Sequence, residues 1–288
     1  MMLKMKNKDK KCIGGDKISL FGIFHVHSNF SHDGKSSLDE IVETCIKKEL
    51  DFCVLTDHYE DFNKASFNEY LREIGRINSR KDFFLIPGIE ISFGDIHIIT
   101  FPLEDYPNIK NERVTNYLHE QSFFMVIAHP SKNDFEKLGK IIKYVDGFEL
   151  WNQKADGSYF PALKFVRNVK RNNIFLKKIK FFGLDLHDIK DPINNVIEVN
   201  ITNSNAEMGS IIDSLKKGNF NNINLKTNLS IKGNDINFSW LEDILISNYM
   251  RGLLIRLLRN TMKIFYIPLG KYKFKSVENA KNFVKRYL

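Results

Sequence analysis

Short apolar runs alternate with segments of helical periodicity from residue 20 onward. The runs have the length of buried strands, whereas the segments between them repeat apolar residues at helical spacing. The predicted strands are residues 21–26, 52–56, 83–86, 96–101, 123–128, 146–150 and 179–184. The predicted helices are residues 37–49, 66–79, 110–121, 133–143 and 160–172. Strands that alternate with helices predict parallel βα units, and therefore an α/β fold that is a doubly wound sheet or a barrel.

Turn and cap residues mark some of the boundaries. Asp33-Gly34 followed by Ser36 and Ser37 supplies a turn and an N-cap for the first helix. Residues 93–95, Phe-Gly-Asp, lie between two short apolar runs and predict a tight hairpin. The pattern changes after residue 187, where a helix at 206–217 precedes an Asn- and Lys-rich segment, a long apolar helical stretch (239–265) and a short basic helix (276–288).

Histidines and carboxylates stand at the ends of the apolar runs. Seven of the eight histidines are placed in this way beside acidic residues. In both candidate architectures, ligands gather at the carboxyl ends of the strands. His25 and His27 are two residues apart and are expected on one face of a strand, and Asp185 and His187 repeat that spacing.

Imidazole and carboxylate together suit zinc, manganese or iron, and the lack of thiolates in the pattern argues against a structural zinc knuckle. Ligands spread over many strand ends can share two or three divalent ions only if the strands converge, as they do in a barrel. Glu90 is the carboxylate best placed to bridge two ions. Clustered divalent ions activate water and polarise a phosphoryl oxygen. The sequence therefore predicts a multinuclear metal site.

Composition and charge agree with a metal-binding core. Hydrophobic residues make up 43% of the 288 residues, which allows a substantial core. Cys12, Cys45 and Cys53 are few and odd in number, so we expect free thiols without disulfide partners in the cytoplasm. No secretory signal or membrane span is apparent. Residues 251–288 carry a net charge of +9 and residues 1–20 carry +4, so the overall +8 leaves the middle acidic.

These motifs together resemble the PHP family, the polymerase-and-histidinol-phosphatase metallophosphoesterases. The resemblance covers roughly residues 21–190 and continues more weakly to about residue 220. Each motif alone is weak, but eight in the family's order are specific. One departure is Leu184, which stands where the family usually has Ser before the aspartate. The matching positions are His25 and His27, Asp33, His58, Glu90, His97, His129, Gly147-Phe148-Glu149, and Asp185 with His187.

The resemblance implies a distorted seven-stranded (β/α) barrel with two or three divalent ions (Mn, Zn or Fe) at one rim. It implies one ion held by His25, His27, Glu90 and Asp185, which are also the predicted catalytic residues. A second ion would be held by Glu90, His97 and His129, and a third by Asp33, His58 and His187. The implied activity is hydrolysis of phosphate esters by attack of a metal-bound hydroxide. The substrate would be a small phosphomonoester, a nucleotide or an oligonucleotide.

Several residues near the motifs have two interpretations. His32 and His119 fit surface histidines better than ligands, and Asp57 fits a supporting or capping role better than ligation. Glu149 either orients a ligand or closes a turn. The side chains that could reach a substrate phosphate, or else are solvated surface groups, are Asn152, Lys154 and Arg167.

The predicted organisation is a basic N-terminal arm (1–19), a metal-binding barrel (20–235) and a basic, mostly helical C-terminal extension (236–288). Arg256, Arg259 and Lys263 share one side of a helical wheel opposite apolar residues. Such a helix packs on its own domain, on nucleic-acid phosphates or on an anionic membrane surface. The alternative to an enzyme is therefore a non-catalytic, metal-stabilised module that docks one of these partners through the extension.

Overall fold

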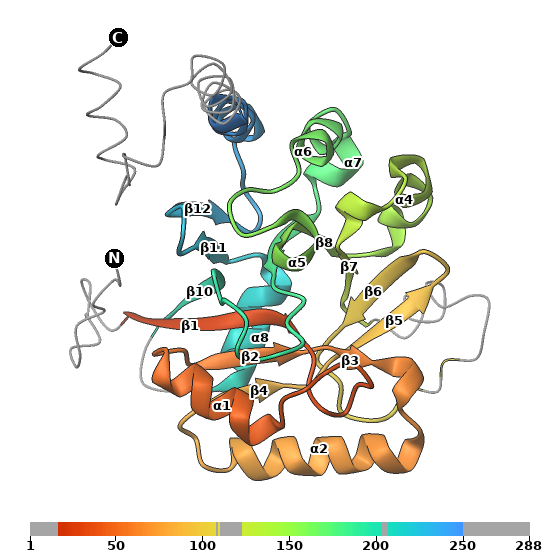
Figure 1. Cartoon of the computed structure of the whole chain (residues 1–288), viewed down its shortest axis with the longest axis vertical. Coiled ribbons are helices and arrows are strands. Elements are labelled where there is room, and N and C mark those ends of the chain that lie inside the picture. The colour runs from red at the N-terminus through yellow and green to blue at the C-terminus, as the bar shows by residue number, and fades with distance from the viewer. Residues whose placement is uncertain (1–16, 108, 110–122, 203–206, 250–288) are drawn as a thin grey trace, which may run out of the picture. The chain divides into compact units, whose positions relative to one another are not determined.

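The computed structural model describes residues 17–107, 109, 123–202 and 207–249, and its described strands form two six-stranded sheets (Figure 1). The first sheet has the order β12-β11-β10-β1-β2-β4 and the second has the order β3-β5-β6-β7-β8-β9. The strands are β1 (Lys17–Val26), β2 (Phe52–Leu55), β3 (Asp57–His58), β4 (Phe84–Ile86), β5 (Ile89–Phe93), β6 (Ile96–Thr100), β7 (Met125–Ala128), β8 (Gly147–Asn152), β9 (Ile179–Gly183), β10 (Asn195–Thr202), β11 (Phe220–Asn224) and β12 (Leu229–Lys232).

The fold is α/β as predicted, but the two sheets are mixed and do not confirm the distorted seven-stranded (β/α) barrel that the resemblance implies. β1 pairs in parallel with β2 but antiparallel with β10, and β5, β6 and β7 form an antiparallel meander. Among the described residues, no continuous ladder closes the two sheets into one barrel. An isolated parallel bridge between Val26 and Leu186 does connect the end of β1 to the chain just after β9. The strand ends of the two sheets therefore meet at that point without full closure.

Helices connect many of the strands, and local capping fixes where they begin. α1 starts after Ser37, whose hydroxyl accepts the Glu40 N–H while Glu40 accepts the Ser37 N–H, as in a capping box. This confirms the N-cap predicted at that position. The α-helices that lie wholly within the described residues are α1 (Leu38–Lys47), α2 (Lys64–Asn78), α4 (Phe135–Ile141), α5 (Gln153–Asp156), α6 (Leu163–Lys170), α7 (Asn173–Leu176) and α8 (Met208–Lys217), and the 3-10 helices are η1 (Tyr59–Asp61), η2 (Pro130–Lys132) and η3 (Ile142–Tyr144).

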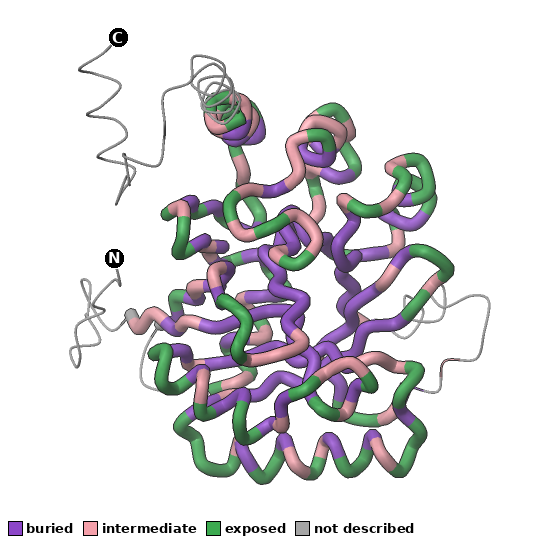
Figure 2. Tube along the Cα trace, viewed as in Figure 1, coloured by how far each residue is buried: buried purple, intermediate pink, exposed green. Residues whose placement is uncertain are grey.

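One aromatic core joins the two sheets beneath the strand ends. Phe24 of β1 stacks on Phe181 of β9 with ring centroids 4.7 Å apart and meets Phe101 edge-on at 5.6 Å. α8 packs over this core through Ile211 and Leu215, which are fully buried. The central strands are buried along most of their length, whereas α1 and α2 keep one exposed face (Figure 2). Burial of this apolar surface holds the strand ends in fixed positions.

The expected elements are largely present where the structure describes them. All seven predicted strands exist, and the predicted 93–95 turn is the β5–β6 hairpin, with Gly94 at a φ of 61°. β3, β5, β10, β11 and β12 were not predicted as strands. The predicted helix 110–121 with His119, the N-terminal arm to residue 16 with Cys12, and the extension beyond residue 249 lie outside the described residues.

The chain divides into two compact units, Met1–Ser239 and Trp240–Leu288. The predicted boundary at residue 236 stays a prediction. Of the second unit, residues 240–249 are described and are helical. Among the described residues, no helix combines the length and apolar composition needed to cross a bilayer.

Candidate metal centre

The structure brings the nine predicted ligands together: eight lie within a strand or within four residues after one, and Asp33 lies in the loop after β1. Residues as far apart in the sequence as His25 and His187, which are 162 positions apart, belong to one cluster because β1 and β9 end side by side. The placements are His25 and His27 at the end of β1, Asp33 in the following loop, His58 in β3, Glu90 in β5, His97 in β6, His129 after β7, and Asp185 and His187 after β9.

Three of these residues have backbone conformations that L-residues rarely adopt. The φ angles are 69° at His25, 29° at His129 and 56° at Asp185. The β1–β2 register also shifts between Phe24 and Val26, so a bulge lies at His25. Simple strand alternation is therefore not what directs His25 and His27, and Asp185 lies beyond the last residue of β9. Left-handed conformations outside glycine concentrate at functional sites.

Glu90 is the centre of the cluster. Its Oε2 lies 3.2 Å from Nε2 of both His25 and His27. Its Oε1 lies 2.8 Å from Nδ1 of His97 and 3.0 Å from Nε2 of His129. One buried carboxylate thus faces two different pairs of imidazoles with its two oxygens. This is the arrangement required of a carboxylate that bridges two ions.

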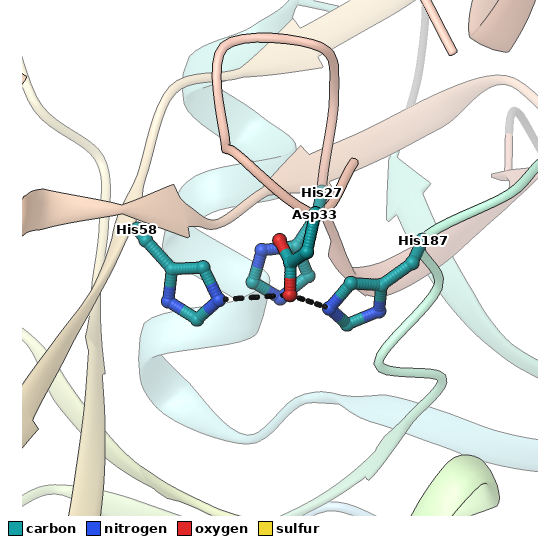
Figure 3. Close-up of side chains that lie close together, drawn as sticks. All are labelled: His27, Asp33, His58 and His187. Carbon is teal, nitrogen blue, oxygen red and sulfur yellow. Dashed lines mark hydrogen bonds and ion pairs between the residues drawn. The ribbon is translucent and has the colours of Figure 1, made fainter. Parts of the chain in front are cut away.

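A second group forms around Asp33 (Figure 3). Oδ2 of Asp33 lies 2.7 Å from Nε2 of His187 and 3.4 Å from Nε2 of His58. His27 stacks on His187 with ring centroids 4.2 Å apart. The other carboxylate oxygen, Asp33 Oδ1, is buried and has no hydrogen-bond partner. A buried acceptor without a partner is costly in the protein alone, so a cation is the natural complement to this group.

Asp185 lies between the two groups. Its Oδ1 is 3.7 Å from Nε2 of both His25 and His27 and 3.4 Å from Nδ1 of His187. The Lys154 ammonium, from the first turn of α5, lies 3.6 Å from the same oxygen. Asp185 therefore sits where a side chain could complete either group of donors.

The donor atoms fit divalent metal ions. Three sets each place one atom per residue within 4.8 Å of one another: His27, Asp33, His58 and His187; His25, His27 and Glu90; and Glu90, His97 and His129. In the second set, the three donor atoms are each 3.2 Å apart. Ligand atoms around a tetrahedral ion with bonds of roughly 2.0 Å lie roughly 3.3 Å apart. The donors are nitrogen and oxygen, a combination that suits zinc, manganese or iron.

The close packing of buried imidazoles and carboxylates shifts the pKa values of several side chains in the cluster. Burial by itself would lower the pKa of His25, but the carboxylates of Glu149, Glu90 and Asp185 outweigh it and raise the pKa well above 6.5. Burial lowers the pKa of His27 to about 4, so this imidazole is neutral at pH 7. Burial would raise the pKa of Glu90, yet the charged His25 and hydrogen bonds from imidazoles lower it well below 4.5. In the protein alone, His25 thus carries the proton that a metal ion would displace.

Two buried carboxylates, Asp57 and Glu149, form hydrogen bonds with residues of the cluster or of the loop next to it. Asp57 accepts hydrogen bonds from the Ser28 N–H (2.6 Å), the Ser28 hydroxyl (2.9 Å) and the Ser31 hydroxyl (2.9 Å). It thereby fixes the loop that carries Asp33. Glu149, which is also buried, lies 2.9 Å from Nδ1 of His25. Ser31 begins the Ser-x-Asp-Gly motif that ends at Gly34, whereas Ser28 belongs to none of the sequence motifs.

The remaining candidates are placed as follows. His32 is exposed, pairs with Asp61 at 2.8 Å and stacks on His58 at the rim. Asn152 is buried, so its side chain is not at the surface of the site. Lys154 is half-exposed and lies 3.0 Å from Nδ1 of His187, and Arg167 lies in α6.

The family model described as the PHP domain matches residues 24–181, more than half of the chain. The chain belongs to the PHP domain family. The matched range contains seven of the nine clustered residues, and Asp185 and His187 follow within six residues of its end.

The individual similar proteins are distant or match only part of the chain. A probable histidinol-phosphatase of Thermotoga maritima is 33% identical over 78 residues, which are 27% of this chain and 33% of that protein. The solved structure of PsfC from Pseudomonas syringae is 14% identical, covers 82% of this chain and 99% of its own, and has a TM-score of 0.49. A Bifidobacterium adolescentis protein is 15% identical over 67% of this chain and 94% of its own, with a TM-score of 0.43. Membership of the PHP family therefore rests on the family model.

Proposed function

We propose that the protein is a metal-dependent phosphoesterase that hydrolyses a small phosphomonoester, a nucleotide or an oligonucleotide. The observation that supports this most directly is the Glu90 carboxylate, whose two oxygens face separate pairs of imidazoles at 2.8–3.2 Å. Family membership supports the same class of chemistry, and the Thermotoga maritima relative is described as a probable histidinol-phosphatase.

The ligand sets would be the three groups of donors, with Asp185 completing one or two of them. Two or three bound divalent ions would supply a nucleophile at neutral pH and offset negative charge on the phosphoryl group. The protein's own contribution is to hold the donors in fixed positions at buried strand ends, where Glu90 and His25 are almost completely excluded from water. Lys154 adds one positive charge at the open side, beside Asp185 and His187, where an anionic substrate would approach.

The first experiment is a phosphatase assay on the full chain. Protein stripped of metal should be inactive on a generic aryl phosphate, and added manganese should restore turnover. Substitution of His25, Glu90 or Asp185 by Ala should reduce activity on the order of a thousandfold or more, since each removes several kcal/mol of charge stabilisation. His32→Ala is the matched control, because it removes an exposed imidazole from the same rim and should leave most activity.

The second experiment addresses the substrate. Mononucleotides, sugar phosphates, histidinol phosphate and short oligonucleotides are compared with manganese, zinc and iron in turn. Turnover of at least one phosphate ester that is lost in Glu90→Ala supports the proposal. Metal binding without turnover across this panel would instead favour the non-catalytic binding module.

A further inference from the structure

Glu149 is a buried carboxylate whose two oxygens both accept hydrogen bonds around the metal centre. Oε1 lies 2.9 Å from Nδ1 of His25. Oε2 accepts the backbone N–H of His129 at 2.6 Å and an N–H of the Asn152 amide at 2.8 Å. We propose that Glu149 is a positioning residue that fixes the orientation and tautomer of His25 and holds the backbone carrying His129. The inference rests on the proposed metal centre and not on which phosphate ester is hydrolysed.

The contact with His25 decides which ring nitrogen faces the centre. A carboxylate at Nδ1 keeps the proton on that nitrogen when the imidazole is neutral, and this leaves the lone pair of Nε2 free. Nε2 of His25 points toward Glu90 Oε2 and His27 Nε2, each 3.2 Å away. Glu149 thus directs the ligating nitrogen from the opposite side of the ring.

The contact with His129 stabilises an unusual backbone. His129 has φ 29° and ψ 50°, and Pro130 follows it. Such a conformation costs on the order of 1–3 kcal/mol and persists only where its surroundings over-determine it. The 2.6 Å hydrogen bond from the His129 N–H to Glu149 is one such constraint. It places Nε2 of His129 at 3.0 Å from Glu90.

Glu149 is itself held in one position. Asn152 caps α5 by accepting the Ala155 N–H with its Oδ1, which turns its amide nitrogen toward Glu149. Both oxygens of Glu149 are therefore occupied by donors, so the carboxylate is not a spare metal ligand. Phe148, the preceding residue, points away and packs against Phe165 and Phe175.

The test compares Glu149→Ala and Glu149→Gln with Phe148→Leu in the full chain. Phe148→Leu weakens the same strand without touching the ligands, so it controls for a merely structural effect. Calorimetric titration of metal-free protein with zinc and manganese gives affinity and stoichiometry. Nitrogen-15 NMR of histidine in the zinc-loaded protein reports which ring nitrogen of His25 carries the proton.

Glu149→Ala should lower metal affinity by about 10- to 100-fold, the usual effect of losing a group that orients a ligand. Glu149→Gln should lie between Ala and wild type, because an amide has one accepting oxygen and cannot serve both sets of donors. Phe148→Leu should lower the melting temperature without changing affinity. In Glu149→Ala, the Nδ1 proton of His25 should exchange rapidly with water, because it has lost its carboxylate acceptor.

Two outcomes overturn different claims. If Glu149→Ala lowers the melting temperature as Phe148→Leu does but keeps wild-type metal affinity and an unchanged His25 spectrum, Glu149 is only structural and the inference is wrong. If the wild-type chain binds neither zinc nor manganese, the proposed metal centre itself fails, and the positioning role fails with it.

Discussion

Gly183 leaves the space that the carboxylate of Glu149 occupies. A Cβ atom placed on residue 183, the last residue of β9, would overlap Oε1 of Glu149. The lack of a side chain there leaves room for the carboxylate beside β9, where Oε1 lies 2.9 Å from Nδ1 of His25. This explains a glycine at the end of a buried strand, two residues before Asp185.

Gly183→Ala should therefore damage the metal centre as well as the fold. The added methyl must displace Glu149, which moves the partner of His25 and costs roughly 1–3 kcal/mol by overpacking. Chemical denaturation and zinc titration measure the two effects. Gly75→Ala in α2 is the control, since nothing lies within 4 Å of its Cβ position and it should stabilise by up to about 1 kcal/mol. Wild-type zinc affinity in Gly183→Ala would show that the Glu149 contact does not matter.

Metal binding should release protons and strengthen as the pH rises. Surrounding carboxylates raise the pKa of His25 well above 6.5 despite its burial, so this imidazole is charged at pH 7 in the metal-free protein. A ligating imidazole must be neutral, so metal and proton compete. Affinity should increase by up to about tenfold per pH unit below that pKa. Calorimetry in buffers of different ionisation enthalpy measures the released protons, and an enthalpy independent of the buffer would contradict the prediction.

The sequence predicted the elements of this fold better than their pairing. Apolar runs such as residues 52–56 identify a buried strand whatever lies beside it. They do not reveal that β1 pairs antiparallel with β10, where Gly22 faces Ile197. β10 begins at Asn195, and β11 contains the buried Asn222 and Asn224. These polar residues interrupt the apolar pattern from which strands are predicted, so neither strand was predicted. Because the partners are far apart in sequence, the pairing into two mixed sheets could not be predicted, and the distorted seven-stranded barrel was expected from the family resemblance.

The clustering of these imidazoles and carboxylates was predictable because residue type and order carry that information. Their surroundings were not, since hydrogen bonds depend on distances that spacing does not give. Glu149 had two open interpretations, and nothing in the sequence indicates that Gly183 makes room for that carboxylate. The bulge at His25 likewise follows from how β1 meets its neighbours, not from local sequence.

Cys45 and Cys53 should be unreactive in the folded protein. Both are free and fully buried, and burial raises the pKa of Cys45 to about 12, so thiolate is scarce at pH 8. The Cys12→Ser substitution removes the third thiol, which lies outside the described residues, so that only Cys45 and Cys53 can react. The Cys12→Ser chain should show no fast reaction with a thiol reagent when native and two thiols in guanidinium. A fast native reaction would mean that α1 or β2 opens readily.

Lys180 should make stability rise with pH under alkaline conditions. This β9 lysine is 1% exposed, and its ammonium donates a 2.7 Å hydrogen bond to the Leu176 carbonyl. Burial lowers its pKa from 10.5 to about 8. Between those pH values the unfolded chain keeps the proton that the folded chain has lost, so the free energy of unfolding increases as the pH rises. Below about pH 8, the charged form costs the fold at most on the order of 3 kcal/mol.

Lys180→Met should remove this pH dependence. At pH 7 we expect the variant to be more stable than wild type by roughly 1–2 kcal/mol, because the lost hydrogen bond to Leu176 offsets part of the gain. Its stability should no longer rise between pH 8 and pH 10.5. Lys232→Met on β12 is the control, since that side chain is exposed and its loss should change stability by less than about 0.5 kcal/mol. Denaturant unfolding at several pH values measures both variants. A Lys180→Met chain with an unchanged alkaline slope would mean that Lys180 keeps its proton in the fold.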